Sequence, residues 1–169
     1  MKTIEVFCVM MLISMSLFSQ GPSKKEIRHQ ADSVAFSNIQ QLIETKNFKF
    51  SATQVLPQSS QSIILTTNEY EVIIKHDSIF CDLPFYGRAY AATPGESGGF
   101  HFSEQVIDYH MKVNEQKQKI EISINAKSRN DNFKLFFTIM GKENSSLSVN
   151  SNNRSGISYW GTINELKEK

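Results

Sequence analysis

The side chains best suited to recognising another molecule lie in residues 83–90, which read LPFYGRAY. The residue before a proline favours extended backbone, and side chains alternate along a strand, so Tyr86, Arg88 and Tyr90 are expected to share one side. A guanidinium between two phenols stacks on aromatic faces while its planar fork remains available to a carboxylate or phosphate. The alternative is an internal stacking clamp that fixes the following loop, residues 91–99. The run is therefore either a ligand-binding surface or a structural clamp.

Arg154 and Trp160 are further candidates for this surface. Arg154 lies in an Asn-rich turn and is solvated unless that turn folds toward the aromatic run, in which case it joins the same pocket. Trp160 shares a predicted strand face with Ser158 and Thr162, and the adjacent Gly161 suits a place where a bulky neighbour comes close. Packing at a strand edge explains this second motif as well as ligand binding does.

His101, Asp108 and His110 are the residues with catalytic or metal-binding chemistry. Asp108 and His110 are two apart on one predicted strand, and His101 is expected on a neighbouring strand, an arrangement that suits a metal site or an acid-base pair. Ser103 would complete the residue types of a hydrolytic triad. The strand pattern places the three ionisable groups outside the core, and no nucleophile-elbow or phosphate-loop motif accompanies them. We therefore predict no metal, no cofactor and no catalytic residue.

Cys81 is predicted to be a buried, unreactive thiol. It lies between Ile79 and Leu83 at strand spacing, and no histidine or basic residue adjoins it. Cys8 lies in the leader that we expect to be removed, which leaves Cys81 alone. An internal disulfide is then impossible, and the mature chain must be held together by its hydrophobic core.

Composition narrows the class of protein. The 169 residues carry 18 Lys plus Arg against 17 Asp plus Glu, a net charge of +1. This balance argues against a general binder of nucleic acids, because binding to phosphate backbones requires a surplus of cations. Hydrophobic residues at 40% and charged residues at 21% fit a folded chain rather than a disordered one. The length suits one domain.

The first 19 residues have the layout of a secretory signal peptide. Lys2 precedes a mostly apolar run, residues 6–18, and small residues follow near its end. We predict cleavage near residue 19 or 20, which gives a single mature domain, residues 20–169, with no transmembrane span. The alternative is an uncleaved amino-terminal anchor.

A helix is predicted over residues 23–46. Ser23 and Glu26 have capping-box spacing, and apolar residues then recur at intervals of three and four. The predicted apolar stripe consists of Ile27, Ala31, Val34, Ala35, Ile39, Leu42 and Ile43. We expect this stripe to pack on the outside of the rest of the domain.

From Phe48 onward the hydrophobic period changes to two, which indicates strands. Residues 120–127 show the clearest alternation, with isoleucines and an alanine on one side and polar residues on the other. Similar alternation marks residues 70–74, 79–83, 100–102, 107–113, 133–139, 147–149 and 157–163. About eight strands with short turns predict an antiparallel meander, curled into a barrel or split into a two-sheet sandwich. In this mainly β domain, the outward residues Ile73, Phe80, Phe136 and Met140 are apolar, and we expect the helix to cover them.

With these motifs in view, the chain resembles the uncharacterised exported bacterial family known as domain of unknown function 4251. The matching features are residues 83–90, residues 98–102 with Tyr109 after them, and Asn153-Arg154 leading into residues 157–163. The resemblance covers nearly all of the mature chain. It implies an exported envelope protein, periplasmic in a Gram-negative cell, with a cell-surface or secreted location as the alternative. It implies no established activity.

We favour a noncatalytic module of the cell envelope that binds an unknown envelope component or a small ligand. The ligand-binding residues that we predict are Tyr86, Arg88, Tyr90, Arg154 and Trp160. One alternative is a carrier of a lipid or another apolar ligand, since inward Phe, Ile and Leu side chains either line a cavity or fill it. A further alternative is a hydrolase that uses His101, Asp108 and Ser103.

Overall fold

The computed structural model describes residues 23–58, 60–66, 69–91, 98–129, 131–141 and 144–166. The signal peptide predicted over residues 1–19 lies outside these residues. The described elements are α2 (Lys24–Glu44), β1 (Asn47–Pro57), β2 (Ile63–Ile64), β3 (Tyr70–Lys75), β4 (Ser78–Leu83), β5 (Phe100–Asn114), β6 (Lys119–Lys127), β7 (Asn132–Met140), β8 (Ser145–Ser151) and β9 (Ile157–Glu165). Within the described ranges, no helix has the length and apolar character that a membrane crossing needs.

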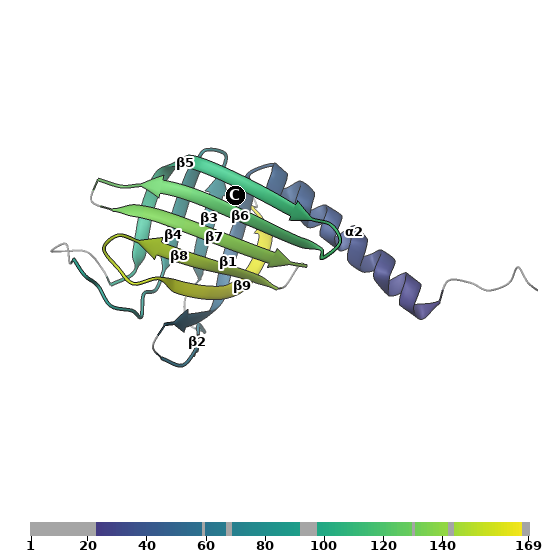
Figure 1. Cartoon of the computed structure of the whole chain (residues 1–169), viewed down its shortest axis with the longest axis horizontal. Helices are drawn as coiled ribbons and strands as arrows, with labels where there is room; N and C mark the ends of the chain where they lie inside the picture. Colours follow the sequence, from purple (N-terminus) through teal and green to yellow (C-terminus); the bar gives the residue numbers. More distant parts are fainter. Residues whose placement is uncertain are drawn as a thin grey trace, which may run out of the picture. The chain divides into compact units, whose positions relative to one another are not determined.

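The strands form a closed antiparallel barrel (Figure 1). β3 to β9 follow one another as a meander, and β1 closes the ring by pairing with β3 on one edge and β9 on the other. The ring contains eight strands, and β2 adds a short extra strand to the end of β1. Closure leaves no open sheet edge within the ring. Of the two predicted architectures, the barrel is therefore the one that forms.

Tight turns connect neighbouring strands, as the predicted meander requires. His76 and Asp77 form the turn between β3 and β4, and His76 has a positive φ of 55°. Gln118, at the end of the turn before β6, has a φ of 46°, and Gly141 after β7 has a φ of 78°. Left-handed residues of this kind reverse the chain within a few residues. Short reversals of this kind favour a meander over long crossovers.

The barrel interior is filled by the apolar side of each strand. On β6 the predicted alternation holds, because Ile120, Ile122 and Ile124 are buried. Around Phe137 the rings of Phe48 and Phe50 pack edge-on, with centroids at 6.2 and 5.8 Å. Such edge-to-face contacts add to the hydrophobic stabilisation of the core.

Helix α2 begins at the predicted capping box and ends at a left-handed residue. The backbone N–H of Ser23 donates to Oε2 of Glu26 at 2.7 Å, and the N–H of Glu26 donates to Oγ of Ser23 at 3.3 Å. These bonds lower the pKa of Glu26. Lys46, with a φ of 52°, donates its N–H to the Ile43 carbonyl. This left-handed cap ends the helix at Glu44, two residues before the predicted end.

The outer packing of α2 was predicted correctly only in part. From Val34 onward the helix lies outside the barrel, and Phe36, Ile39 and Ile43 join the same buried cluster as the barrel side chains. Ile27 and Val34 of the predicted stripe are instead 54% and 56% exposed. The buried face therefore belongs to the C-terminal half of the helix and includes Phe36, which the predicted stripe omitted.

The prediction that the helix covers the outward apolar residues of the barrel is wrong. Phe80, Phe136 and Met140 remain 44%, 43% and 53% exposed. Separate apolar side chains on a protein surface need no partner, because much of any folded surface is apolar. The helix instead buries its apolar residues in the main core cluster.

Two strands predicted separately are one long strand, β5. It runs from Phe100 to Asn114 and carries a bulge between Val106 and Asp108. The extra residue at a bulge shifts the alternation of the strand by one position. Ile107, predicted to face the core, is consequently 65% exposed.

Candidate functional site

The aromatic run that follows β4 is held against the turn before β9. The N–H of Arg88 donates to Oγ of Ser155 at 3.1 Å, and the N–H of Ser155 donates to the Arg88 carbonyl at 2.9 Å. The N–H of Tyr90 donates to the Asn153 carbonyl at 2.8 Å. The Asn-rich turn thus folds toward the run.

Tyr159 anchors the same run from inside the barrel. This residue of β9 is fully buried, and its hydroxyl donates to the Pro84 carbonyl at 2.7 Å. Burial raises the pKa of the Tyr159 phenol. The bond satisfies a polar group that would otherwise be costly to bury. The start of the run is therefore fixed to the core.

Arg154 is the arginine that stacks on aromatic rings. Its Cζ lies 5.4 Å from the ring centroid of Phe85 and 5.2 Å from that of Phe100. Its Nη1 donates to the Gly99 carbonyl at 2.5 Å. The half-buried guanidinium joins the run, the end of the loop before β5 and the first residue of β5. The arginine that stacks here is thus Arg154 on Phe85 and Phe100, whereas the sequence suggested Arg88 with Tyr86 and Tyr90.

Of the residues predicted in the run, Tyr86 lies in a hollow at the surface. Tyr86 and Tyr90 are 46% and 67% exposed, and Arg88 is exposed as well. The hollow has a volume of about 460 Å³, and we call it the His101 pocket. Its described lining consists of Glu69, Tyr70, Asp82, Pro84, Phe85, Tyr86, Gly98, Gly99 and His101. Arg88 and Tyr90 are outside this set.

A side-chain contact between β4 and β5 forms one wall of the His101 pocket. Asp82 and His101 are direct cross-strand partners, and Nδ1 of His101 lies 2.8 Å from Oδ1 of Asp82. A Cβ atom at Gly99 would collide with Nε2 of His101. Glycine therefore allows the imidazole to lie against the backbone at this point. The ring is held by Asp82 on one side and borders Gly99 on the other.

The pocket combines carboxylates with aromatic faces. Glu69 and Asp82 supply negative charge, and Phe85 and Tyr86 supply rings. Aromatic faces and carboxylates both attract cations, and a partly apolar hollow excludes some of the competing water. The arrangement suits a ligand with an ammonium group.

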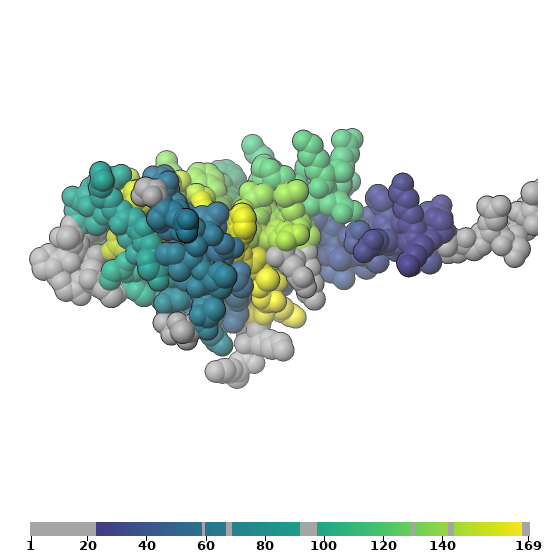
Figure 2. Space-filling model, turned by 90° about the horizontal axis from the view of Figure 1, so that it is seen from below, coloured from purple at the N-terminus to yellow at the C-terminus, as the bar shows by residue number. Residues whose placement is uncertain are grey.

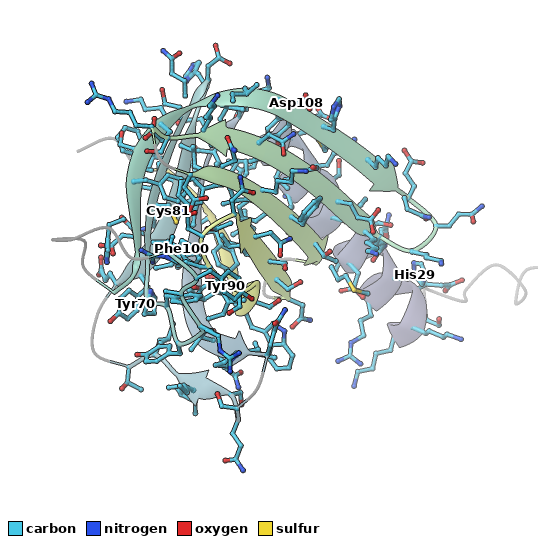
Figure 3. The ribbon with its side chains drawn as sticks, turned by 60° about the vertical axis from the view of Figure 1, so that its left-hand side comes forward. His29, Tyr70, Cys81, Tyr90, Phe100 and Asp108 are labelled. Atoms are coloured by element: carbon cyan, nitrogen blue, oxygen red, sulfur yellow. The ribbon has the colours of Figure 1, made fainter. Side chains whose placement is uncertain are left out.

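The residues considered as catalytic or metal-binding candidates do not assemble. His101, Ser103, Asp108 and His110 all lie on β5, so His101 is not on a neighbouring strand as predicted. Asp108 lies seven positions after His101, which is about 23 Å along an extended strand. Asp108 pairs with Nε2 of His110 at 3.0 Å and lies away from Phe100 (Figure 3). Both histidines are exposed, and within the described ranges no three metal-binding side chains cluster.

Trp160 lies elsewhere on the barrel. It is 52% exposed on β9, between Gln54 of β1 and Ser146 of β8. It borders a second hollow whose described lining shares no residue with the His101 pocket. Of the five predicted ligand contacts, the structure brings only Tyr86 into the His101 pocket, with Arg154 bound to its edge at Gly99.

Sequence reasoning missed Asp82, Glu69 and Phe85 as pocket residues. His101 was expected outside the core, and Asp82 lies between the two predicted core residues Cys81 and Leu83, so the strand alternation was the signal that could have found the pair. Their contact depends on the register between β4 and β5, which alternation alone does not fix. Phe85 was expected on the side opposite Tyr86, yet both border the hollow, because β4 ends at Leu83.

Comparison with known proteins gives a family and a fold. Residues 30–163 match the family model DUF4251, described as a domain of unknown function. A crystal structure of a DUF4251 family protein from Bacteroides eggerthii DSM 20697 is similar, with a TM-score of 0.62 and 19% sequence identity. The match covers 80% of this chain and 91% of that chain, and at this identity it concerns the fold alone. No curated protein matches the chain.

Proposed function

The chain belongs to the DUF4251 family, and we propose that it is a noncatalytic envelope module that binds an ammonium-bearing ligand or partner in the His101 pocket. Export is part of this proposal, supported by the signal-peptide pattern of residues 1–19. Amino-terminal sequencing of the protein from an envelope fraction tests export: an intact first residue would contradict cleavage.

The binding proposal rests on one observation: carboxylate and aromatic side chains line the same pocket. Oδ1 of Asp82 lies 2.8 Å from Nδ1 of His101, and the carboxylate shares the lining with Pro84 and Tyr86. Glu69 adds a second carboxylate. An ammonium group gains from both kinds of contact, whereas an anion is repelled by the carboxylates.

The position of the His101 imidazole favours binding over hydrolysis. Nε2 of His101 borders Gly99, whereas Ser103 lies in the opposite direction along β5. A serine nucleophile must lie within hydrogen-bond reach of its base. Within the described lining of the pocket there is also no serine, threonine or cysteine. Among the described lining residues, the Asp82–His101 pair therefore has no serine, threonine or cysteine to activate, which favours a role in ordering the pocket.

The alternative of an apolar carrier draws no support from the described interior. Phe48, Phe50 and Phe137 pack against one another there, and Phe102 stacks on Phe133 at a centroid distance of 4.0 Å. Rings in mutual contact fill the space that a carried lipid would need.

The test uses benzylammonium as the cationic probe and benzyl alcohol as its neutral match. We expect benzylammonium to shift the backbone amide signals of Gly98 and Gly99 in an NMR titration, with a Kd of about 1 mM, equivalent to about 4 kcal/mol. Benzyl alcohol should bind at least fivefold more weakly. Asp82→Asn and Glu69→Gln should each weaken benzylammonium binding severalfold, because each removes a charge from the lining.

Asp108→Asn is the matched control for the benzylammonium titration. Asp108 is also a carboxylate paired with a histidine on β5, at 3.0 Å, but it lies outside the pocket lining. Its substitution should leave binding unchanged. Equal binding of the charged and neutral probes, or wild-type affinity in both pocket variants, would contradict the proposal.

A further inference from the structure

A row of cross-strand neighbours on the outer face of the barrel carries Trp160 at its centre. Thr138 on β7 pairs with Ser146 on β8, Ser146 pairs with Trp160 on β9, and Trp160 pairs with Gln54 on β1. Figure 2 shows this side of the molecule, where β9 in yellow lies beside β1 in blue. Four strands thus present these side chains together.

The row borders a hollow of about 400 Å³, which we call the Trp160 hollow. Its described lining contains hydroxyl and amide side chains, the indole of Trp160 and the thioether of Met140, and none of these residues is charged. The volume lies within the usual range of small-ligand sites, about 300 to 1,000 Å³. The hollow can therefore receive a small uncharged molecule.

The backbone of the hollow is fixed by a bulge in β1. The register between β1 and β9 shifts between Ala52 and Gln54, so Thr53 is the extra residue. Oγ1 of Thr53 donates to the Trp160 carbonyl at 3.2 Å, and the N–H of Leu65 donates to the Thr53 carbonyl at 2.9 Å. Bulges of this kind redirect side chains at functional positions. Trp160 is thus held at its backbone while its ring stays half exposed.

One polar atom beside the hollow is unused by the protein. Ser145 belongs to the lining and is 3% exposed, and its Oγ has no hydrogen-bond partner among the described residues. Buried hydroxyls without partners are uncommon in folded proteins, because each one costs free energy. Ser145 lies on the same inward side of β8 as Leu147, so its hydroxyl belongs to the barrel interior and not to the surface that Trp160 presents.

We propose that the Trp160 hollow binds a neutral carbohydrate unit. A sugar ring has an apolar face of C–H groups, which suits the exposed indole, and hydroxyls around its edge, which suit Gln54, Thr138 and Ser146. The absence of charge from the described lining disfavours ionic ligands, because their desolvation would find no compensating partner. This site and the His101 pocket share no described lining residue, so either proposal can fail alone.

The test uses the labelled full chain on an array of neutral and acidic glycans. We expect retention on neutral glycans above the level on sialylated or uronic-acid glycans. A retained neutral oligosaccharide is then titrated while the emission of Trp160, the single tryptophan of the chain, is followed. Its emission should change with saturation, because the sugar covers the ring. Retention of no glycan, or preference for acidic glycans, would overturn the proposal.

Substitutions distinguish a sugar-binding site at the Trp160 hollow from a contact between copies of the chain. Trp160→Ala should weaken binding at least tenfold in calorimetry, and Ser146→Ala should weaken it severalfold. Phe80→Ala removes another exposed ring, on β4 and outside the hollow, and should leave the affinity unchanged. Wild-type affinity in both hollow variants would overturn the proposal. A dimer detected by sedimentation would also overturn the proposal, if Trp160→Ala abolishes the dimer and sugar does not. The hollow would then be a contact between two copies of the chain.

Discussion

Arg154 and Arg88 lie close together in the fold but in different surroundings. Ala89 and Arg154 form an isolated antiparallel bridge, so the two arginines belong to facing segments. The guanidinium of Arg154 lies over Phe85 and Phe100, whereas Arg88 is exposed. In the sequence, Arg88 is close to the rings of residues 83–90, and Arg154 is far from them along the chain. The sequence does not show which arginine reaches the rings, because that depends on how the turn before β9 folds.

Two buried phenols predict how the stability of the protein responds to alkaline pH. Burial raises the pKa of Tyr109 to about 12, and it also raises the pKa of Tyr159. An unfolded tyrosine has a pKa near 10, so the unfolded chain releases these protons first as the pH rises. The free energy of unfolding should therefore fall above about pH 10, by up to about 1.4 kcal/mol per pH unit for each phenol that stays protonated. Urea unfolding at a series of pH values from 8 to 11.5 measures how steeply the free energy of unfolding falls with pH.

Substituting each phenol by phenylalanine distinguishes the two contributions. The Tyr109 hydroxyl is buried without a hydrogen-bond partner among the described residues, so Tyr109→Phe should cost little at pH 7 and flatten the alkaline slope. Tyr159→Phe should also flatten the slope but cost about 1 kcal/mol at pH 7, because it removes the bond to Pro84. Unchanged slopes in both variants would show that neither phenol causes the alkaline loss.

At the scale of single elements, alternation located most strands but not their irregularities. The period of two identified the core side of β6 and β7, where the pattern is unbroken. On β5 it misplaced Ile107, the extra residue of the bulge, whereas Tyr109 and Met111 pack against the core as predicted. The pocket pair Asp82 and His101 was missed for a related reason, since it depends on the register between two strands. A bulge and a register are set by pairing between strands, which a single sequence does not display.

Because β1 and β9 approach each other closely at Gly161, adding one methyl group there should destabilise the protein severely. A Cβ atom at Gly161 would collide with the Ser51 carbonyl and with the Phe50 ring. Backbone atoms in a paired strand cannot move away without breaking the ladder, so Gly161→Ala should lower the free energy of unfolding by about 1 to 3 kcal/mol. Thermal unfolding followed by circular dichroism measures the loss.

Gly98→Ala is the matched control for this substitution. A Cβ at Gly98 meets no heavy atom within 4 Å, and the residue has no left-handed backbone. Its substitution should change stability by no more than about 0.5 kcal/mol. Equal losses in the two variants would indicate a general cost of replacing glycine rather than a collision between strands.

At the scale of the whole molecule, barrel closure depends on strands from the two ends of the β region. Ser51 of β1 pairs with Thr162 of β9, and the bulge and Gly161 lie at this same seam. The sequence predicted the meander because neighbouring strands and their turns leave local signals. It left barrel and sandwich open, because the pairing that closes the ring joins distant segments and has no local signature.

The shared core predicts that the barrel and the attached half of α2 unfold together. Ile39 and Ile43 belong to the same buried cluster as the barrel side chains, and Ile43 is completely buried. Ile43→Ala should therefore lower the free energy of unfolding by about 2 to 5 kcal/mol through lost burial and a new cavity. Ile27→Ala, at a helix position that is 54% exposed, should stay within about 0.5 kcal/mol of the wild type.

Two optical probes make this cooperativity measurable. Far-UV circular dichroism follows the helix and strands together, and the fluorescence of Trp160 follows β9 alone. Because one cluster links these elements, the two urea transitions should coincide in the wild type and shift together in Ile43→Ala. If the helical signal of Ile43→Ala were lost at lower urea while Trp160 emission stayed native, the helix and barrel would unfold separately. The buried face of α2 would then be an attachment to the barrel and not a part of its core.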